Sequence, residues 1–205
     1  GSIAKTAMCM KNILKNKIMI SFRDAALIVY LELLTRQLRN SFNFVYDVMV
    51  KSQVIVHTIE KKCFLIIYVY SQKISAFFQN SGFWLEYITA YACQEIGFPC
   101  YRGVLFQSKD RHITEVDVLI DLGKVLFFIE CKDTYSFTDK DLKKIYNLRK
   151  KTNCLSYGIF VCSKAINNLN YKKYDLELVK YKYNYHLFKE QLKEVLAKKI
   201  VDLSF

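Results

Sequence analysis

The clearest hydrophobic pattern in the chain begins after residue 80. A helix N-cap signal, Asn80-Ser81-Gly82, is followed by apolar residues every three or four positions, the spacing of one buried helix face. The pattern predicts a helix that ends before Gly97 and Pro99. Its buried side chains are expected to be Leu85, Ile88, Thr89, Ala92, Cys93 and Ile96.

The pattern after this helix predicts five strands and two helices. Two of the strands form a hairpin, because the apolar runs 113–120 and 124–131 flank a tight turn at Asp121-Leu122-Gly123-Lys124. A strand, a helix and a strand follow one another later, which implies a parallel crossover. The strands are expected at 101–106, 113–120, 124–131, 156–162 and 176–183, and the helices at 139–151 and 185–199. The order predicts an α/β fold, a mixed central sheet flanked by helices.

The pattern before residue 80 is weaker. Ser21-Phe22-Arg23-Asp24 resembles a capping box and predicts a helix over 25–39. Residues 43–70 are β-like, with strands expected at 44–46, 54–56 and 64–70 and a turn at 60–62. We expect an N-terminal α+β extension, either a wing-like or dimerising unit or an extension packed on the main domain. The expected divisions are an expression scar at 1–2, this extension at 3–79 and the main domain at 80–205.

Composition and charge narrow the class of protein. With 52% hydrophobic and 24% charged residues, the chain can bury a sizeable core. Its net charge of +12 points to a polyanion, nucleic acid or a membrane surface, although a Lys- and Tyr-rich proteome would give the same excess without a ligand. Seven scattered cysteines without a C-x-x-C pair, and no apolar run long enough to span a bilayer, predict a cytoplasmic protein without a disulfide framework, zinc ribbon or membrane partner.

Most of the net positive charge lies in the last third of the chain. Residues 140–200 contain fifteen Lys and Arg against five Asp and Glu. Some lysines fall on one side of the predicted helix 139–151, and others alternate with tyrosines after residue 171, a pattern that can pair phosphates and stack bases. The alternative is an edge strand protected by lysines. The lysines expected to bind nucleic acid are Lys140, Lys143, Lys144, Lys150, Lys151, Lys180 and Lys182.

The candidate chemistry lies in the predicted hairpin. Glu130 and Lys132 are two residues apart on one strand and project to the same side, and Asp117 on the neighbouring strand can face them. Two carboxylates suit a hard divalent cation such as Mg²⁺, and a lysine beside a metal-bound water can orient it or stabilise a phosphate under attack. An E-x-K pair can also be a surface ion pair. Here the apolar run 125–129 leads directly into Glu130, and an unpaired charge on a buried strand is costly.

These residues carry a resemblance to a known family. Asp117 and Glu130-Cys131-Lys132, after a helix bearing Glu86, resemble the PD-(D/E)XK nuclease superfamily, whose core has the order α-β-β-β-α-β. Segments 82–86, 115–119 and 128–132 resemble the nuclease domain of the CRISPR-ancillary endonucleases that cyclic oligoadenylate activates. The resemblance covers residues 80–199 and implies a restriction-endonuclease-like core.

The resemblance implies a site and an activity. Asp117, Glu130 and the Cys131 carbonyl would bind Mg²⁺ or Mn²⁺, Lys132 would activate the attacking water, and Glu86 would reach the site directly or through water. Glu115 is a second-choice ligand. The implied protein is a metal-dependent endonuclease, a homodimer in prokaryotic defence, that cuts DNA, with RNA left open as a second substrate.

Two other functions fit the same residues. One is an enzyme like the Holliday-junction resolvases on the same fold; the other is a non-catalytic nucleic-acid-binding or dimerisation module. A nucleotide activator is not expected, because a complete nucleotide-sensing domain does not fit before Asn80. No glycine-rich loop for the phosphates of ATP or a dinucleotide occurs either.

Overall fold

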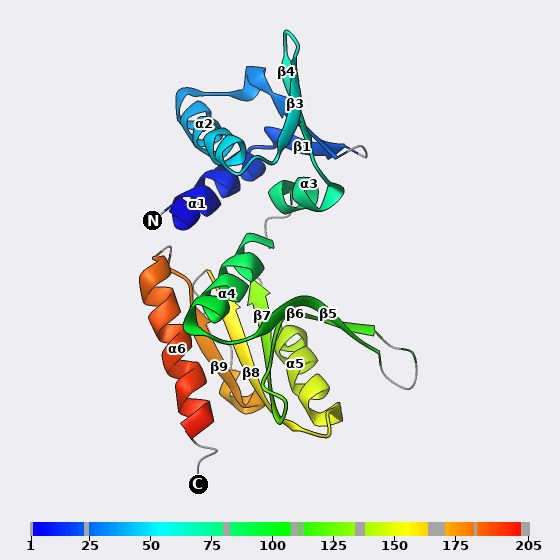
Figure 1. Ribbon diagram of the computed structural model, residues 1–205, viewed down its shortest axis with the longest axis vertical. Coiled ribbons are helices and arrows are strands. Elements are labelled where there is room, and N and C mark those ends of the chain that lie inside the picture. The colour runs from blue at the N-terminus through cyan, green and yellow to red at the C-terminus, as the bar shows by residue number, and fades with distance from the viewer. Residues whose placement is uncertain are drawn as a thin grey trace. The chain divides into compact units, whose positions relative to one another are not determined.

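The computed structural model describes residues 2–22, 25–79, 83–107, 111, 113–133, 138–163, 171–182 and 184–201. The chain divides into two compact units, Gly1–Trp84 and Leu85–Phe205. Figure 1 labels their elements. No helix among the described residues is long and apolar enough to cross a membrane.

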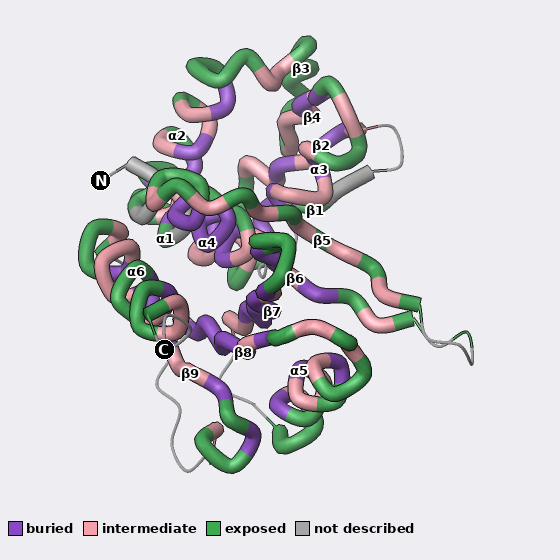
Figure 2. The backbone as a smooth tube through the Cα atoms, turned by 60° about the horizontal axis from the view of Figure 1, so that its bottom comes forward, coloured by how far each residue is buried: buried purple, intermediate pink, exposed green. Residues whose placement is uncertain are grey.

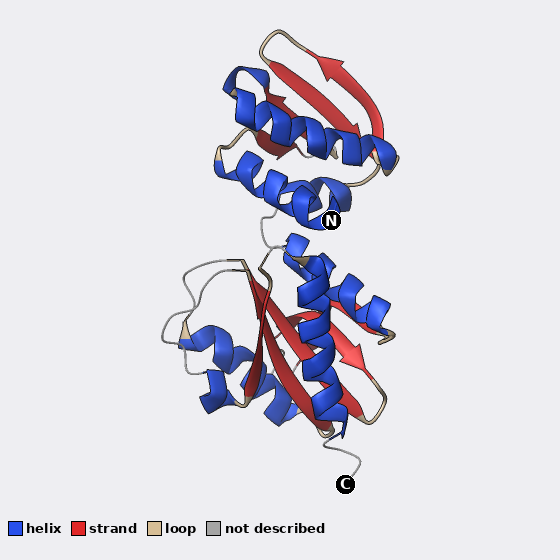
Figure 3. Cartoon of the chain, turned by 90° about the vertical axis from the view of Figure 1, so that its left-hand side faces the viewer, coloured by secondary structure: helices blue, strands red, loops and turns tan. Residues whose placement is uncertain are grey.

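The first unit is a four-stranded antiparallel sheet with helices. The sheet has the order β1-β2-β4-β3, and α1 and α2 pack against each other on one of its faces (Figure 3). Its core joins the inner helix faces to the strands through residues such as Ile13, Met49 and Ile67. The elements are α1 (Ser2–Lys15), β1 (Met19–Phe22), β2 (Ala26–Tyr30), η1 (Leu31–Leu33), α2 (Arg36–Lys51), β3 (Ile55–Glu60), β4 (Phe64–Val69) and α3 (Gln72–Gln79).

Several predictions for this unit are wrong. Residues 26–30 form strand β2 rather than a helix, as suits their β-branched residues and half-buried alternation. The expected strand 44–46 lies inside α2, which begins after Thr35, whose Oγ1 accepts a hydrogen bond from Leu38 N at 3.4 Å. Helices α1 and α3 were not predicted. The expected hairpin around 60–62 is confirmed as β3–β4, whereas Arg23 and Asp24 lie outside the described residues.

The second unit is a five-stranded mixed sheet. The order is β5-β6-β7-β8-β9; β5, β6 and β7 are antiparallel, and β7, β8 and β9 are parallel. Figure 2 shows α5 on one side of β7 and β8, and α4 and α6 on the other. The elements are α4 (Phe83–Ile96), β5 (Cys100–Gln107), β6 (Ile113–Asp121), β7 (Val125–Lys132), α5 (Asp139–Lys151), β8 (Leu155–Cys162), η2 (Tyr171–Tyr174), β9 (Leu176–Lys180) and α6 (Tyr185–Val201).

The predictions for this unit agree with the structure in type and order. The mixed sheet and the parallel step from β7 through α5 to β8 are confirmed. The expected turn is also confirmed, since Asp121 Oδ1 accepts a hydrogen bond from Gly123 N at 2.7 Å and Gly123 adopts a φ of 79°. The last strand is shorter than predicted and ends at Lys180. The N-cap signal at 80–82 lies outside the described residues.

Glycine at position 158 lets α5 pack directly on β8. A Cβ atom at this position would lie 2.2 Å from Leu176 Cδ2 and 2.9 Å from Ile145 Cγ2, so a side chain there would force its neighbours to shift. The contact sets the height of α5 above the sheet and therefore the reach of the α5 side chains toward β7.

Candidate active site

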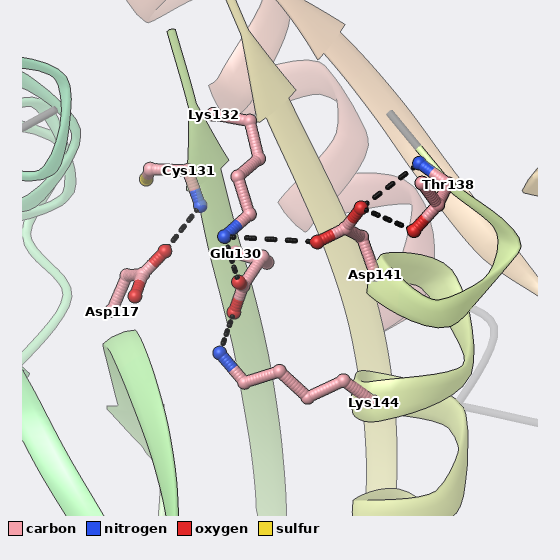
Figure 4. A network of polar contacts seen from close by, with 7 residues as sticks. All are labelled: Asp117, Glu130, Cys131, Lys132, Thr138, Asp141 and Lys144. Atoms are coloured by element: carbon pink, nitrogen blue, oxygen red, sulfur yellow. Dashed lines mark hydrogen bonds and ion pairs between the residues drawn. The ribbon is translucent and has the colours of Figure 1, made fainter. Parts of the chain in front are cut away.

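Glu130 is a completely buried carboxylate at the end of β7. Its side chain has no solvent exposure, and its two oxygens face two ammonium groups. Lys132 Nζ lies 2.9 Å from Oε1, and Lys144 Nζ lies 2.6 Å from Oε2 (Figure 4). As the strand period predicts, Glu130 and Lys132 project to the same side of β7.

The contact between Glu130 and Lys132 leaves one oxygen of the carboxylate incompletely satisfied. Glu130 Oε1 is buried and has no hydrogen-bond partner among the described residues, so Lys132 neutralises its charge without occupying it in hydrogen-bond geometry. Burial acts to lower the pKa of Lys132, but the interaction with Glu130 and the negative charges of Asp117 and Asp141 together outweigh burial, and the pKa is raised. Lys132 is therefore held as a cation.

The capped start of α5 fixes the helix so that Lys144, in its second turn, contacts Glu130. Asp141 completes a capping box, since its Oδ2 accepts hydrogen bonds from Thr138 N and Thr138 Oγ1, both at 2.9 Å. The other oxygen of Asp141 lies 3.9 Å from Lys132 Nζ. The sequence indicated a nucleic-acid contact for Lys144 and no role for Asp141. Lys144 pairs with Glu130 and Asp141 pairs with Lys132, each on a different element. The spacing of residues along the sequence does not reveal such pairs.

Asp117 lies where the β6–β7 ladder ends. The strand pairing stops at Val118 and Ile129, and beyond it Asp117 Oδ2 accepts a hydrogen bond from Cys131 N at 2.7 Å. Burial, and then the charge of Glu130, raises the pKa of Asp117 to about 6. Asp117 on β6 and Glu130 on β7, which the sequence predicts to face each other, thus interact electrostatically.

Glu86 belongs to the same electrostatic group. It lies in the first turn of α4, and burial, followed by the charge of Asp117, raises its pKa to about 7. Arg102 opposes this shift, with Nη1 3.5 Å from Glu86 Oε2 and its guanidinium over the ring of Tyr87. Sequence reasoning missed Arg102, because an arginine on an edge strand gives no signal of its partner.

Cys131 presents only its main chain to this site. Its thiol is buried, with Sγ 3.6 Å from Thr89 Oγ1 on α4, and burial raises its pKa well above the ordinary value. The thiol therefore stays protonated and is a poor metal ligand. The main-chain carbonyl is the atom of Cys131 that remains as a candidate ligand.

The residues fit a divalent cation in chemistry but are not gathered around one. Within the described ranges, no three Asp, Glu, His or Cys side chains are arranged to hold a metal ion. The carboxylates of Asp117 and Glu130 are nevertheless oxygen donors on adjacent strands, and Glu130 Oε1 accepts no hydrogen bond from the part of the chain that the structure describes. The repulsion that raises the pKa of Asp117 is one that a bound cation would relieve.

An open groove of about 1120 Å³ adjoins the site. It runs between α5 and the ends of β5 and β6, and Asp141 and Lys144 contribute both to its wall and to the ion pairs around Glu130. Four of the lysines expected to bind nucleic acid line it: Lys140, Lys143, Lys144 and Lys151.

The other predicted lysines do not line the groove. Lys150 Nζ lies over the ring of Tyr146, 4.5 Å from its centroid. Lys180 is at the end of β9, and Lys182 is exposed beyond it. The structure therefore brings together four of the five predicted lysines of α5 and leaves Lys150, Lys180 and Lys182 elsewhere.

Comparison with known proteins identifies the fold. No family model and no curated protein matches the chain. The solved structure of protein VC1899 from Vibrio cholerae matches 96% of this chain and 50% of its own, with 17% identity and a TM-score of 0.59. The structure of Can2 from Sulfobacillus thermosulfidooxidans in complex with cyclic tetra-adenylate matches 92% of this chain and 50% of its own, with 17% identity and a TM-score of 0.51.

The chain thus spans about half the length of each of these structures. At this level of identity the likeness concerns the fold. The predicted α/β class, a mixed sheet flanked by helices in the order of a restriction-endonuclease-like core, is confirmed.

Proposed function

We propose that the second unit is a metal-dependent endonuclease that hydrolyses phosphodiester bonds in DNA. The observation that carries the proposal is the buried Glu130, which lies between Lys132 and Lys144, interacts with Asp117 and adjoins a lysine-lined groove. The fold shared with Can2 supports it. A buried carboxylate with an unsatisfied oxygen is costly for stability, and a cation-binding role accounts for it.

Each residue of the site has a distinct task in this proposal. Asp117, Glu130 and the Cys131 carbonyl would hold the metal, with Glu86 acting through water. A Mg²⁺ or Mn²⁺ ion, when bound, supplies a Lewis acid and lowers the pKa of a coordinated water. Lys132, kept charged by Glu130, orients the attacking water and offsets negative charge as it develops on the phosphate.

The groove is the proposed binding site of the substrate. Lys140, Lys143 and Lys151 lie along α5 and can pair with consecutive phosphates. These contacts carry no base information, so the proposed binding tolerates different sequences. The backbone would then pass Lys144 and reach the carboxylates.

The proposal is tested by incubating the protein with plasmid, single-stranded DNA, RNA and a four-way junction, with Mn²⁺ or with EDTA. Cleavage is expected with Mn²⁺ and not with EDTA, and Glu130→Gln and Lys132→Ala should abolish it while DNA binding is largely retained. Glu194→Gln and Lys193→Ala, which change exposed residues of α6, serve as matched controls. Equal cleavage by wild type and Glu130→Gln would refute the site, and exclusive cleavage of junctions would identify a resolvase.

A further inference from the structure

Lys144 contacts Glu130 more closely than Lys132 does, yet the proposed reaction gives it no task. Its Nζ is 2.6 Å from Oε2, against 2.9 Å between Lys132 Nζ and Oε1. One lysine is enough to handle the attacking water. The second ammonium group therefore requires its own explanation, because ordering a lysine side chain against a buried carboxylate costs conformational entropy and desolvation.

Lys144 belongs to the groove as well as to the carboxylate. Its side chain is 30% exposed, and it lines the groove together with Lys140 and Lys151 on the same helix. The residues 140 and 144 are one helical turn apart and so share a face. The lysine side chain is a flexible four-carbon chain that ends in a compact charge. Its ammonium group can therefore turn from Glu130 toward the groove while the capped start of α5 stays fixed.

A divalent cation and Lys144 compete for the same carboxylate. Two positive charges at one buried carboxylate repel each other strongly, because the interior screens charge weakly. Occupation of Glu130 by a cation would therefore release Lys144. A phosphate in the groove would provide the nearest alternative partner of opposite charge.

We propose that Lys144 is a positioning residue that exchanges partners. It holds the Glu130 carboxylate while the site lacks a cation and pairs with a substrate phosphate once a cation binds. This inference rests on the proposed function for its substrate. Because Lys144 then links the two events, nucleic acid tightens cation binding and the cation tightens nucleic-acid binding by the same factor.

The test measures binding of Mn²⁺ by calorimetry at pH 8, in the absence and presence of a non-cleavable phosphorothioate oligonucleotide. In Lys144→Gln, Mn²⁺ should bind about tenfold more tightly than in wild type without the oligonucleotide, a typical coupling between sites. The tightening caused by the oligonucleotide should disappear. Lys140→Gln, which changes a groove lysine that has no contact with Glu130 among those described, should weaken oligonucleotide binding and leave Mn²⁺ affinity without oligonucleotide unchanged.

Unchanged or weaker Mn²⁺ binding in a folded Lys144→Gln variant would overturn the exchange, since a purely structural lysine gives that result. If Lys144→Gln does not fold, Lys144→Met keeps the length of the side chain without its charge, and the same affinities decide. Failure of the proposed function gives a different result. If the wild type cuts no nucleic acid but Lys144→Gln still tightens Mn²⁺ binding, the partner exchange of Lys144 stands and the nuclease activity is refuted. A wild type without Mn²⁺ binding overturns both.

Discussion

Asp117 and Cys131 are joined by a 2.7 Å hydrogen bond in which a carboxylate takes the place of a strand partner. Because the donor is the main chain of β7, the position of Asp117 depends on the strand that carries Glu130 and Lys132, and not on a neighbouring side chain. The bond therefore extends the contact between the two proposed ligand strands beyond their last main-chain pair, Val118 and Ile129.

This bond predicts different results for two substitutions of Asp117. Asp117→Asn keeps an oxygen that can accept the bond but loses the charge, so it should fold like wild type and lose Mn²⁺ binding and cleavage. Asp117→Ala also leaves the buried Cys131 N–H unsatisfied and should cost a further ~1–3 kcal/mol of unfolding free energy. Urea unfolding of the two variants, alongside cleavage assays, separates the effects; equal stability of the two variants would contradict the bond's role.

The raised carboxyl pKa values predict a pH dependence of stability without metal. Asp117 and Glu86 have folded pKa values of about 6 and about 7, above their ordinary values, so the folded state binds protons more tightly than the unfolded state. Their stabilising effect is complete at acid pH and is lost as pH rises through these values. In EDTA at pH 8, Asp117→Asn should therefore melt roughly 5 °C above wild type, with a smaller difference at pH 5.

Thermal unfolding monitored by circular dichroism measures this difference, and Asp47→Asn, an exposed residue of α2, is the control. Saturating Mn²⁺ should reverse the order, because wild type alone gains the binding energy of the ion. A variant that melts below wild type at pH 8 in EDTA would argue against electrostatic repulsion at the site.

The packing at Gly158 predicts a large loss of stability from one methyl group. Gly158→Ala places a Cβ 2.2 Å from Leu176 Cδ2, so the Leu176 side chain, or β8, β9 or α5 with it, must shift, at a cost of about 2–3 kcal/mol. The double substitution Gly158→Ala with Leu176→Ala should cost less than the sum of the single changes, because the second change removes the nearest clash. Additive losses in urea unfolding would show that the clash is relieved in another way.

The groove predicts a specific salt dependence of DNA binding. If the wild type neutralises about five phosphates, the logarithm of its association constant should fall with the logarithm of salt concentration at a slope of about −4.5. Lys151→Gln should reduce the magnitude of that slope by about one, while Lys193→Gln, on α6, should leave it unchanged. Fluorescence anisotropy at several salt concentrations measures both, and equal effects of the two variants would exclude the groove as the phosphate path.

Much of the second unit could be predicted from the sequence because its signals are local. The uninterrupted apolar run before Glu130 identified a central strand, and the two-residue spacing to Lys132 fixed their common side. The partners of Glu86 and Glu130 could not be predicted in the same way. Arg102 and Lys144 reach them from other elements, and only the packing of α4 and α5 on the sheet determines those distances.

The first unit was harder to predict because some of its apolar segments fit both the spacing of a helix and that of a strand. Phe44-Val45-Tyr46 looks like part of a strand, but Phe42, Val45 and Met49 are the residues that α2 buries, at helical spacing. In the short segment 26–30 the apolar residues are consecutive and fit a helix or a strand equally well, so the partner strand β4 decided the outcome.

Cys131 contacts α4, whereas its charged neighbours on β7 do not point toward that helix. Its thiol packs against Thr89 of α4, while Glu130 and Lys132 on either side of it point toward α5. The helix that carries Glu86 thus contacts β7 at the residue between Glu130 and Lys132. A shift of α4 would therefore act on the short segment of β7 that carries both Glu130 and Lys132.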